Sequence, residues 1–519
     1  MIKKRILILG AGFMQGVAIR TAKEKGWRVV AVDGNPSAPC RDMADRFEPI
    51  DLKDTRSLVR FARELKEKGG LDGVMTAATD FSASVAAVAE ACGLPGHSLE
   101  AAKNASDKIR MRERFAEAGI PSPAFAGLAS SDIPIARGIL SARGIGFPLV
   151  VKPCDNMGAR GCRRVDDANA LDAALADAVR YSRTGRVIVE EYMEGPEFSF
   201  EALVFDGQFV MTGMADRHIS FPPYFIEMGH TIPSRYPSSD LAALERVFSE
   251  ASRVLGLSHG VAKGDLKLTA RGPMVGEIAG RMSGGYMSGW TFPYSSGVNL
   301  TAAALDLAVG VRPVGLTGGT GAFCAERAWI SIPGVVSEVT GLEAARALPG
   351  VRDVFPRALA GDRVTFPRNN VEKCGNVLAV ADDYDTASRL AESACQSVFL
   401  RLAPRNVETD AFLNRHADSQ FPPSAFAFDL SSPDGQRSLE SVIVGHGPIM
   451  MPKQLARAVD ESVDWQGRTL RKAIESALTI EPGLRSALSE SDSRSPALWK
   501  ALIRGGIQGI VYAYDCNRP

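Results

Sequence analysis

The chain has 519 residues, of which 45% are hydrophobic and 23% charged, an ordinary globular composition on a chain too long for one hydrophobic core. Lys plus Arg and Asp plus Glu both total 60, so the formal net charge is zero, which argues against a broad nucleic-acid-binding surface. No stretch approaches the roughly 20 apolar residues of a membrane span, and the eight dispersed cysteines contain no Cys-x-x-Cys pair. We expect a multidomain cytoplasmic protein with reduced thiols and without nucleic-acid or membrane partners.

The first 105 residues alternate predicted strands and helices. An apolar strand is followed by Gly10 and Gly12, then by a helix and a second strand that ends at Asp33. This order is typical of a doubly wound α/β domain. The predicted strands cover residues 5–9, 28–32, 47–50 and 73–76, and the predicted helices cover 17–25, 55–68 and 81–92. The glycines and Asp33 would also suit a nicotinamide oxidoreductase, although Gly16 falls one position later than the usual spacing.

The last of these strands is followed by Thr79 and Asp80. Ligands bind at the carboxyl ends of strands in open α/β sheets. The sequence therefore predicts that this edge of the domain faces a ligand.

Lys108 stands at the start of a charged helix predicted over residues 109–118, which Ser106 or Asp107 can cap. Lys152 lies at the end of a short buried strand. That ammonium group needs a partner, because burying it unpaired is costly.

The loop over residues 155–162 follows directly and contains Gly158 and Gly161. A loop with two glycines between strands can fold its N–H groups over phosphates. We predict a phosphate cradle made with Lys152, and an ordinary hairpin loop is the alternative.

The strand predicted over residues 187–193 carries Glu190 and Glu191 and ends at Met193. A turn leads from it to an alternating strand over 198–205. The backbone groups at the end of the first strand could hold a planar base.

The stretch over residues 260–285 predicts a hairpin with a tight turn centred at Arg271. Side chains alternate along a strand, so Lys263, Asp265 and Lys267 share one face of the first strand. The second strand is predicted to present Val275, Glu277, Ala279 and Arg281 on one face. The register places Asp265 opposite Glu277. Facing carboxylates destabilise a sheet, so a metal ion between them is one interpretation, and a solvated face neutralised by the two lysines is the other.

Between these segments lies a loop that contains Arg217, Glu227 and His230 among aromatic residues. A polar cluster in such surroundings suits a small zwitterion or carboxylate, and a purely structural loop is the alternative.

The C-terminal third begins after a glycine-rich stretch at 316–321. Short strands and one helix are predicted over 323–330, 335–340, 377–380 and 386–398. A linker is predicted over 419–432, followed by helices over 455–463, 469–478 and 495–504 and a strand over 509–514. The last region could be a specificity appendage, a partner module or an oligomerisation element, which would make the protein a homo-oligomer.

Taken in this order, the motifs resemble the ATP-grasp superfamily of carboxylate–amine ligases. The N-terminal domain is similar to that of biotin carboxylase, and the hairpin with Lys263-Gly264-Asp265 and the run from Glu277 to Gly285 is similar to the L-amino-acid-ligase branch. The resemblance implies an α/β and α+β multidomain fold. Its parts would be a doubly wound domain over 1–105, an ATP-grasp domain over 106–315 with a lid lobe over 120–190, a closing lobe over 316–414 and an appended domain over 415–519.

The resemblance also implies site roles and cofactors, namely ATP and Mg²⁺, with Mn²⁺ as a substitute. The residues implied to contact ATP are Lys108, Lys152, Gly158, Gly161, Glu190, Glu191, Met193 and Glu197. Asp265 and Glu277 would hold magnesium, and Arg281 and Lys263 would be catalytic. The implied substrate contacts are Arg217, Glu227, His230, Gly284 and Gly285.

This resemblance implies an ADP-forming ligase that activates a small carboxylate as an acyl phosphate and joins it to an amine, with amino-acid-like substrates. One departure is Ala279, which stands where the family usually has a metal-binding Asn. Another is Asp265, which is shorter than the usual Glu. A biotin carboxylase-like enzyme and a non-catalytic ATP-binding regulator remain alternatives.

Overall fold

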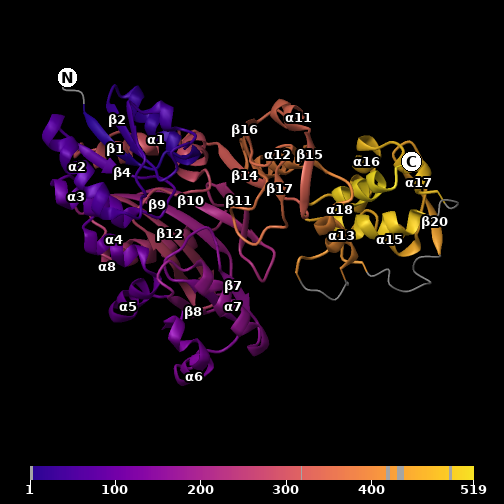
Figure 1. The fold of residues 1–519 in the computed structure, drawn as a ribbon, viewed down its shortest axis with the longest axis horizontal. Helices are drawn as coiled ribbons and strands as arrows, with labels where there is room; N and C mark the ends of the chain where they lie inside the picture. The colour runs from indigo at the N-terminus through magenta and orange to yellow at the C-terminus, as the bar shows by residue number, and fades with distance from the viewer. Residues whose placement is uncertain (1–3, 317, 416–420, 429–437, 490–493, 519) are drawn as a thin grey trace. The chain divides into compact units, whose positions relative to one another are not determined.

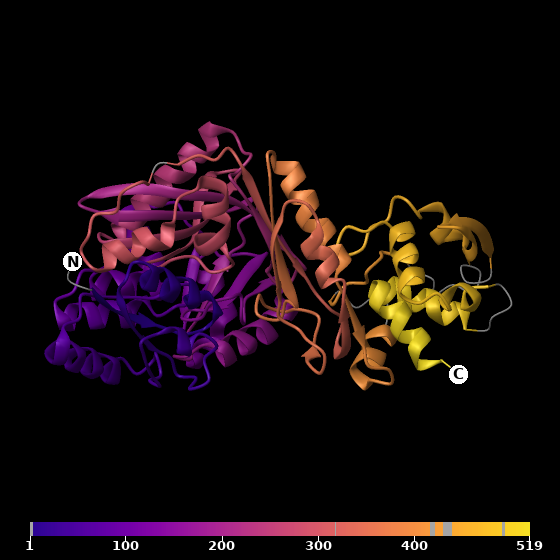
Figure 2. The ribbon, with the colours of Figure 1, turned by 90° about the horizontal axis from the view of Figure 1, so that it is seen from above.

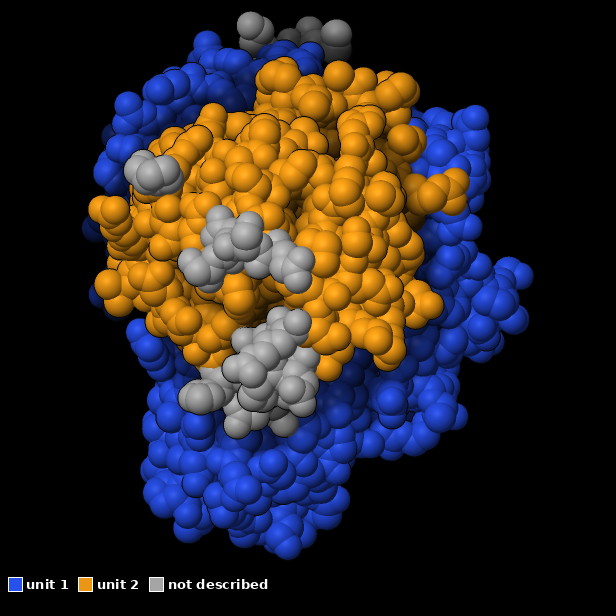
Figure 3. Space-filling model, turned by 90° about the vertical axis from the view of Figure 1, so that its right-hand side faces the viewer, with its two compact units in different colours: residues 1–219, 229–325, 380–387 blue, residues 220–228, 326–379, 388–519 orange. Residues whose placement is uncertain are grey.

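The computed structural model describes residues 4–316, 318–415, 421–428, 438–489 and 494–518. The chain forms two compact units, coloured separately in Figure 3. Unit 1 contains residues 1–219, 229–325 and 380–387, and unit 2 contains 220–228, 326–379 and 388–519. Within the described residues, no helix is long and apolar enough to cross a membrane. The predicted division into four domains stays a prediction, and Thr317 and much of the predicted linker lie outside the described residues.

The N-terminal part of unit 1 is the predicted doubly wound domain. Its elements are β1 (Arg5–Leu9), α1 (Phe13–Glu24), β2 (Arg28–Val32), β3 (Arg46–Glu48), α2 (Thr55–Gly69), β4 (Gly73–Met75), α3 (Ser82–Cys92) and α4 (Leu99–Ser106). The strands form a sheet in the order β3-β2-β1-β4, with parallel pairing throughout. The sheet lies between α1 and the pair α2 and α3 (Figure 1). Alternate residues of β1 pack on opposite sides, Ile6 and Ile8 toward α1 and Leu7 and Leu9 toward α2, because both faces of such a sheet are covered.

A second sheet of unit 1 has the order β5-β8-β6-β7. This region contains α5 (Lys108–Ala118), β5 (Phe125–Leu128), α6 (Ala136–Ala142), β6 (Leu149–Pro153), β7 (Arg163–Val165), α7 (Ala168–Tyr181) and β8 (Val187–Glu191). Helix α5 begins where predicted, because the Asp107 carboxylate accepts hydrogen bonds from the N–H groups of Ile109 (2.9 Å) and Arg110 (3.2 Å). It ends at Gly119, whose φ of 70° suits glycine.

The remaining strands of unit 1 follow the order β13-β12-β9-β10-β11. The elements are β9 (Glu197–Phe205), β10 (Gln208–Ser220), β11 (Ile226–Ile232), α8 (Ser238–Val254), β12 (Gly260–Thr269), β13 (Gly272–Ala279), α9 (Phe292–Ser296) and α10 (Leu300–Ala308). Strands β12 and β13 form the predicted hairpin, with Asp265 opposite Glu277.

The prediction for Val275 is wrong. The register shifts between Asp265 and Leu266, so that Gly276 forms a β-bulge and Leu266 pairs with Val275. One extra residue reverses the alternation of side chains. Val275 is therefore buried in the core beside Ile278, while Glu277 and Ala279 remain on the face of Asp265 and Lys263.

From Phe323 onward the chain forms shorter elements. They are β14 (Phe323–Trp329), β15 (Gly334–Thr340), α11 (Leu342–Ala347), β16 (Val351–Pro356), β17 (Arg363–Val364), β18 (Gly375–Ala381), α12 (Tyr384–Ser397), β19 (Phe399–Leu402), α13 (Val407–Asn414), β20 (Leu439–Val444), β21 (Gly447–Pro452), α15 (Lys453–Arg457), α16 (Leu470–Ile480), α17 (Leu484–Ala487) and α18 (Ser495–Cys516). Strands β20 and β21 pair as a hairpin that the sequence analysis did not predict.

The strand predicted over residues 509–514 is wrong, because these residues belong to α18. This helix has a break at Gly506, where φ is 62° and ψ is −149°. Beyond the break, Ile510, Val511 and Tyr512 are buried, and α18 lies within the gathered C-terminal helices, yellow in Figure 2. A helix buried on most sides has little amphipathic periodicity, so a short apolar run reads like a strand.

Candidate active site

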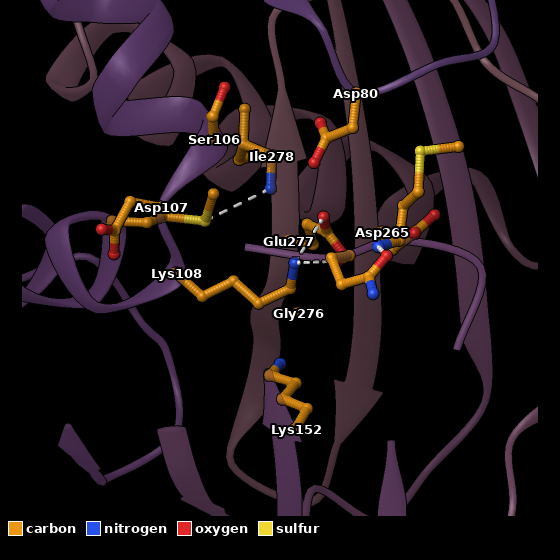
Figure 4. Close-up of polar contacts among 12 residues, drawn as sticks. Asp80, Ser106, Asp107, Lys108, Lys152, Asp265, Gly276, Glu277 and Ile278 are labelled. Carbon is orange, nitrogen blue, oxygen red and sulfur yellow. Dashed lines mark hydrogen bonds and ion pairs between the residues drawn. The ribbon is translucent and has the colours of Figure 1, made fainter. Parts of the chain in front are cut away.

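Lys108 links three segments of unit 1. Its side chain is buried at the first turn of α5, and its Nζ donates a hydrogen bond to the carbonyl of Asn156 (2.9 Å) and pairs with Glu277 Oε1 (3.2 Å). Burial alone would lower the pKa of Lys108, but the charges of Glu277 and Asp80 raise it above its ordinary value. The ammonium group therefore joins the glycine-containing loop to the hairpin in its charged form (Figure 4).

Lys152 has the partner that its burial demands. Its Nζ lies 2.7 Å from Glu190 Oε2, and Arg112 Nε lies 2.9 Å from Glu190 Oε1. The Glu190 side chain is only 3% exposed; burial raises its pKa, and the two cations outweigh that effect and lower it. Arg112 also donates to the Gly276 carbonyl (2.6 Å). The Glu190 side chain thus positions Lys152, and Arg112 is a site-forming residue that the sequence analysis missed.

Glu277 is the most accessible carboxylate of the hairpin, with its side chain 27% exposed. Burial would raise its pKa, but Lys108, Lys263, Lys152 and Arg281 together lower the pKa to about 2. The side chains of Lys108, Lys152 and Asp80 are directed toward it (Figure 4). Glu277 is thus a negative charge surrounded by positive ones, which suits metal ligation beside an anion.

Asp265, the second predicted metal ligand, is more enclosed. Its Oδ1 accepts a hydrogen bond from Ser199 Oγ (3.1 Å), and its Oδ2 pairs with Arg217 Nη1 (3.1 Å) and with Lys263 Nζ. Lys263 stands directly opposite Ala279 in the ladder. The ammonium group therefore lies on the face where the family usually has an Asn.

The residues predicted to bind the base and ribose lie along the other end of the hairpin. Glu197 pairs with Arg217 and, at 3.6 Å, with Lys267, whose Nζ also donates to the Met193 carbonyl (3.1 Å). Glu191 pairs with Arg271 at 2.7 Å near the turn. The structure thus brings Met193 and Glu197 together and ties both to β12.

The loop between β6 and β7 contains Gly158 and Gly161, with φ values of 70° and 68°. A Cβ added at Gly161 would lie 2.9 Å from Tyr181 Cβ, so both space and backbone conformation require glycine there. Asn156 holds the loop by accepting from Lys108 and by donating to the Tyr181 carbonyl (2.7 Å).

Beyond Glu277, strand β13 leads to Arg281 and a tight turn. The N–H of Ser283 donates to Glu201 Oε1 (2.6 Å), and the Ser288 hydroxyl contacts the same oxygen. Glu201 is fully buried on β9, and its burial raises its pKa. This anchor fixes the turn through Gly284 and Gly285, the latter with a φ of 66°. No sequence signal distinguished Glu201 from other residues of its strand.

The loop predicted to contain the substrate residues is largely strand, because Arg217 lies on β10 and Glu227 and His230 lie on β11. Arg217 joins Glu197 and Asp265 on the nucleotide side of the hairpin. His230 is buried, with its Nε2 2.7 Å from Thr291 Oγ1. Glu227 belongs to unit 2, where its N–H donates to Asn370 Oδ1 (2.8 Å) and its carbonyl accepts from Lys373 (2.7 Å).

Three family models match the chain. They describe an ATP-grasp N-terminal domain over residues 19–96, an ATP-grasp domain over 145–289 and an L-amino acid ligase C-terminal domain 2 over 328–403. The second match begins after Lys108 and covers Lys152, the loop with Gly158 and Gly161, and the hairpin. These matches identify the chain as an ATP-grasp protein with an ATP-grasp N-terminal domain and a C-terminal domain of the L-amino acid ligase type.

Individual relatives extend the likeness beyond these segments. An uncharacterised protein of Sinorhizobium fredii is 26% identical over 74% of this chain and 78% of its own length. Carnosine synthase 1 of Gallus gallus is 27% identical over a match that covers 60% of this chain and 36% of that enzyme. The structure of an L-amino acid ligase from Bacillus licheniformis matches with a TM-score of 0.69 and 21% identity, over 78% of this chain and all of that one; at this identity the likeness concerns the fold.

ATP-grasp enzymes use ATP and Mg²⁺, and the residues of this site fit both. Lys108 and Lys152 place two ammonium groups beside Glu277, as polyphosphate binding requires. Among the described residues there is no group of three or more metal-ligating side chains, so a Mg²⁺ at Glu277 would need phosphate oxygens and water to complete its shell, which is its usual preference. The oxygens of Asp265 already contact Ser199, Lys263 and Arg217.

Proposed function

We propose that this ATP-grasp enzyme activates a small carboxylate as an acyl phosphate, releases ADP, and joins the acyl group to an amine, with amino-acid-like substrates. The observation that carries the proposal is the arrangement around Glu277. Four cations, Lys108, Lys152, Lys263 and Arg281, lower the pKa of one accessible carboxylate against the opposite effect of its burial. Phosphoryl transfer depends mainly on positioning and on neutralising charge.

In this proposal the nucleotide side is formed by Lys108, Lys152, the loop with Gly158 and Gly161, and the segment from Glu190 to Glu197. Glu277 and Asp265 hold magnesium, which neutralises phosphate charge when it is bound. Arg281 follows just after the end of the strand that carries Glu277 and stabilises negative charge on the reacting acyl group. Lys263 contributes a further positive charge beside Asp265.

The amino-acid-like substrate class is supported by the relatives. Carnosine synthase 1 is among the similar proteins, and the C-terminal family model that matches carries the L-amino acid ligase name. The biotin carboxylase structures that match are 18% identical to this chain, and a likeness at that level speaks for the fold.

The test is ADP release from ATP and Mg²⁺ with pairs of common L-amino acids and D-alanine, with hydroxylamine as a trap for the activated carboxylate. We expect ADP and hydroxamate to form together and to vanish when EDTA removes the metal. Arg281→Met should retain ATP binding but lose hydroxamate formation about 100-fold or more. Arg312→Met is the matched control, because Arg312 is 62% exposed and pairs with Asp206 at the surface.

ADP release that no substrate pair stimulates, from a chain that still binds ATP, would contradict the proposal. It would favour a non-catalytic ATP-binding regulator. The observation behind that second candidate is the engagement of Asp265 by Lys263 and Arg217, with Ala279 opposite.

A further inference from the structure

Asp80 lies on a loop that is fixed against the segment after β13. Ala77 pairs with Met282 in a parallel bridge, and the Ala78 N–H donates to the Met282 carbonyl (3.3 Å). Ala78 has a φ of 57°, a left-handed conformation that residues with a Cβ rarely adopt. Such conformations persist where surrounding contacts impose them, and they concentrate at functional sites. The loop therefore holds Asp80 in a defined place next to Arg281.

The Asp80 side chain is only 6% exposed, yet within the described residues its closest ionic contact is Arg281 Nε at 4.0 Å. That is beyond hydrogen-bond distance. Arg281 Nε is itself buried without a hydrogen-bond partner, although Nη1 of the same residue donates to the Met282 carbonyl (3.0 Å). Buried carboxylates normally accept several hydrogen bonds. Asp80 is a buried acceptor that the protein leaves open.

Asp80 also belongs to the proposed active site. Its carboxylate is directed toward Glu277 (Figure 4), and its charge contributes to the raised pKa of Lys108. The N-terminal domain thus supplies a negative group to the end of the hairpin where Arg281 lies. The Asp80 position is on the opposite side of Glu277 from Lys152 (Figure 4).

We propose that Asp80 binds the ammonium group of the amine substrate and positions that nitrogen beside Arg281. The inference rests on the proposed ligase function and assigns one residue to its second substrate. An ammonium group offers three N–H donors, which match the open acceptors of Asp80. The charge of Asp80 would repel a carboxylate, and Arg281 and Lys108 would repel a divalent ion about twice as strongly as a singly charged ammonium group.

The test compares two nucleophiles for the same activated carboxylate. Hydroxylamine is neutral near pH 7 and needs no anionic anchor, whereas an amino acid binds as an ammonium group, whose nitrogen must lose a proton before it attacks. For Asp80→Asn we expect the kcat/KM for the amino-acid acceptor to fall about 10- to 100-fold, chiefly through its KM, as expected for the loss of a charged hydrogen bond. Hydroxamate formation and the KM for ATP should change less than about twofold, and Asp80→Glu should restore part of the acceptor KM.

Asp72→Asn is the matched control. Asp72 precedes β4 as Asp80 follows it, and it accepts from the Arg5 N–H (2.7 Å) and pairs with Lys4 (3.3 Å) away from the hairpin. Its substitution should leave both nucleophiles unaffected. Equal losses of hydroxamate and of amide product in Asp80→Asn would overturn the inference, because Asp80 would then act on ATP, on the carboxylate substrate or on the fold. Unchanged kinetics with both nucleophiles would overturn it as well, whereas a wild-type chain that forms no hydroxamate would refute the ligase function instead.

Discussion

Glu190 and Glu277 are two carboxylates of unit 1 that lie between basic side chains, but only one of them is open to a ligand. Glu190 on β8 is 3% exposed and is paired at 2.7 Å with Lys152 and at 2.9 Å with Arg112. Glu277 on β13 is 27% exposed, and its ion pair with Lys108 is longer, at 3.2 Å. In both cases the surrounding cations lower the pKa of the carboxyl group.

This difference in exposure distinguishes a carboxylate that positions its neighbours from one that can bind a ligand. Glu190 is enclosed by the groups that it positions, so its contribution is to hold Lys152 and Arg112 in place. Four cations lower the pKa of Glu277, which pairs with Lys108 at 3.2 Å, and part of its side chain remains accessible. Charge alone does not distinguish the two residues, whereas exposure and contact geometry do.

Removing the charge of Glu190 should have the largest effect on stability. In Glu190→Gln, Lys152 and Arg112 would remain buried without their counter-charge, and breaking a buried pair in this way costs about 3–5 kcal/mol. Urea unfolding of this variant and of a control variant would measure the change in the free energy of unfolding. Glu100→Gln is the control, since Glu100 is 62% exposed and pairs with Arg110 at the surface, where such pairs contribute about 0–1 kcal/mol. A loss below about 1 kcal/mol for Glu190→Gln would mean that water replaces the pair.

Glu277→Gln should reverse this pattern, with a modest effect on unfolding and a large one on turnover. The amide cannot supply the negative charge that would hold magnesium next to Lys108, so we expect substrate-dependent ADP release to fall about 100- to 1,000-fold. Steady-state kinetics across a Mg²⁺ titration would measure it. Glu117→Gln, in an exposed i,i+3 pair with Arg114, should behave as wild type. Turnover retained in Glu277→Gln would show that the metal is held elsewhere.

His97 sharpens the comparison, because it is buried without a charged partner. Its Nε2 lies 3.0 Å from the Val261 carbonyl, and its Nδ1 accepts from the N–H groups of Ser258 and His259 (both 3.3 Å). Burial lowers the pKa of His97 from 6.5 to about 4, against a smaller opposite effect of the hydrogen bond to Val261. The neutral ring is thus the form that fits the fold.

A folded-state pKa below the unfolded one means that this stability is complete above about pH 6.5 and is lost as the pH falls through about 4. We expect the free energy of unfolding to decrease by about 2–3 kcal/mol over that window through His97. His97→Gln should flatten the decrease, measured by urea unfolding at a series of pH values, whereas His446→Gln at an exposed position should not. An unchanged slope in His97→Gln would assign the acid sensitivity to other groups.

The hairpin shows how far local sequence patterns reach. A turn centred at Arg271 predicted the pairing of Asp265 with Glu277, but the observed turn pairs Thr269 with Gly272, and the bulge at Gly276 is what brings Glu277 opposite Asp265. The bulge at Gly276 was not predictable from alternation, since one inserted residue leaves no periodic trace, and it moved Val275 into the core. The predicted doubly wound N-terminal domain was confirmed, because each strand and helix there is short, regular and ended by glycine or polar residues.

Contacts between residues far apart in the chain could not be predicted from the sequence. Arg112 and Glu201 are ordinary charged residues in the sequence. The structure shows that Arg112 on α5 positions Lys152 through Glu190. It also shows that Glu201 on β9 holds the turn that follows Arg281. Asp80 was placed at a ligand-binding edge, but its partner Arg281 is about two hundred positions away. Glu227 was grouped with Arg217 by proximity in the chain, whereas the fold assigns the two residues to different units.

The smallest expected effect concerns the number of metal ions. Lys263 and Arg217 already contact Asp265, and Ala279 offers no oxygen opposite them, so we expect one tightly held Mn²⁺ per chain in the presence of a non-hydrolysable ATP analogue. Electron paramagnetic resonance of free Mn²⁺ would count the bound ions. Ala279→Asn adds an amide oxygen on the face of Lys263 and should strengthen a second, weaker site by no more than about tenfold, while Ala279→Leu, which adds a side chain of similar size without an oxygen, should not. Two equally tight ions in the wild-type chain would show that Asp265 exchanges Lys263 and Arg217 for metal when the nucleotide binds, and the contrast between an enclosed Asp265 and an accessible Glu277 would then hold only without the nucleotide.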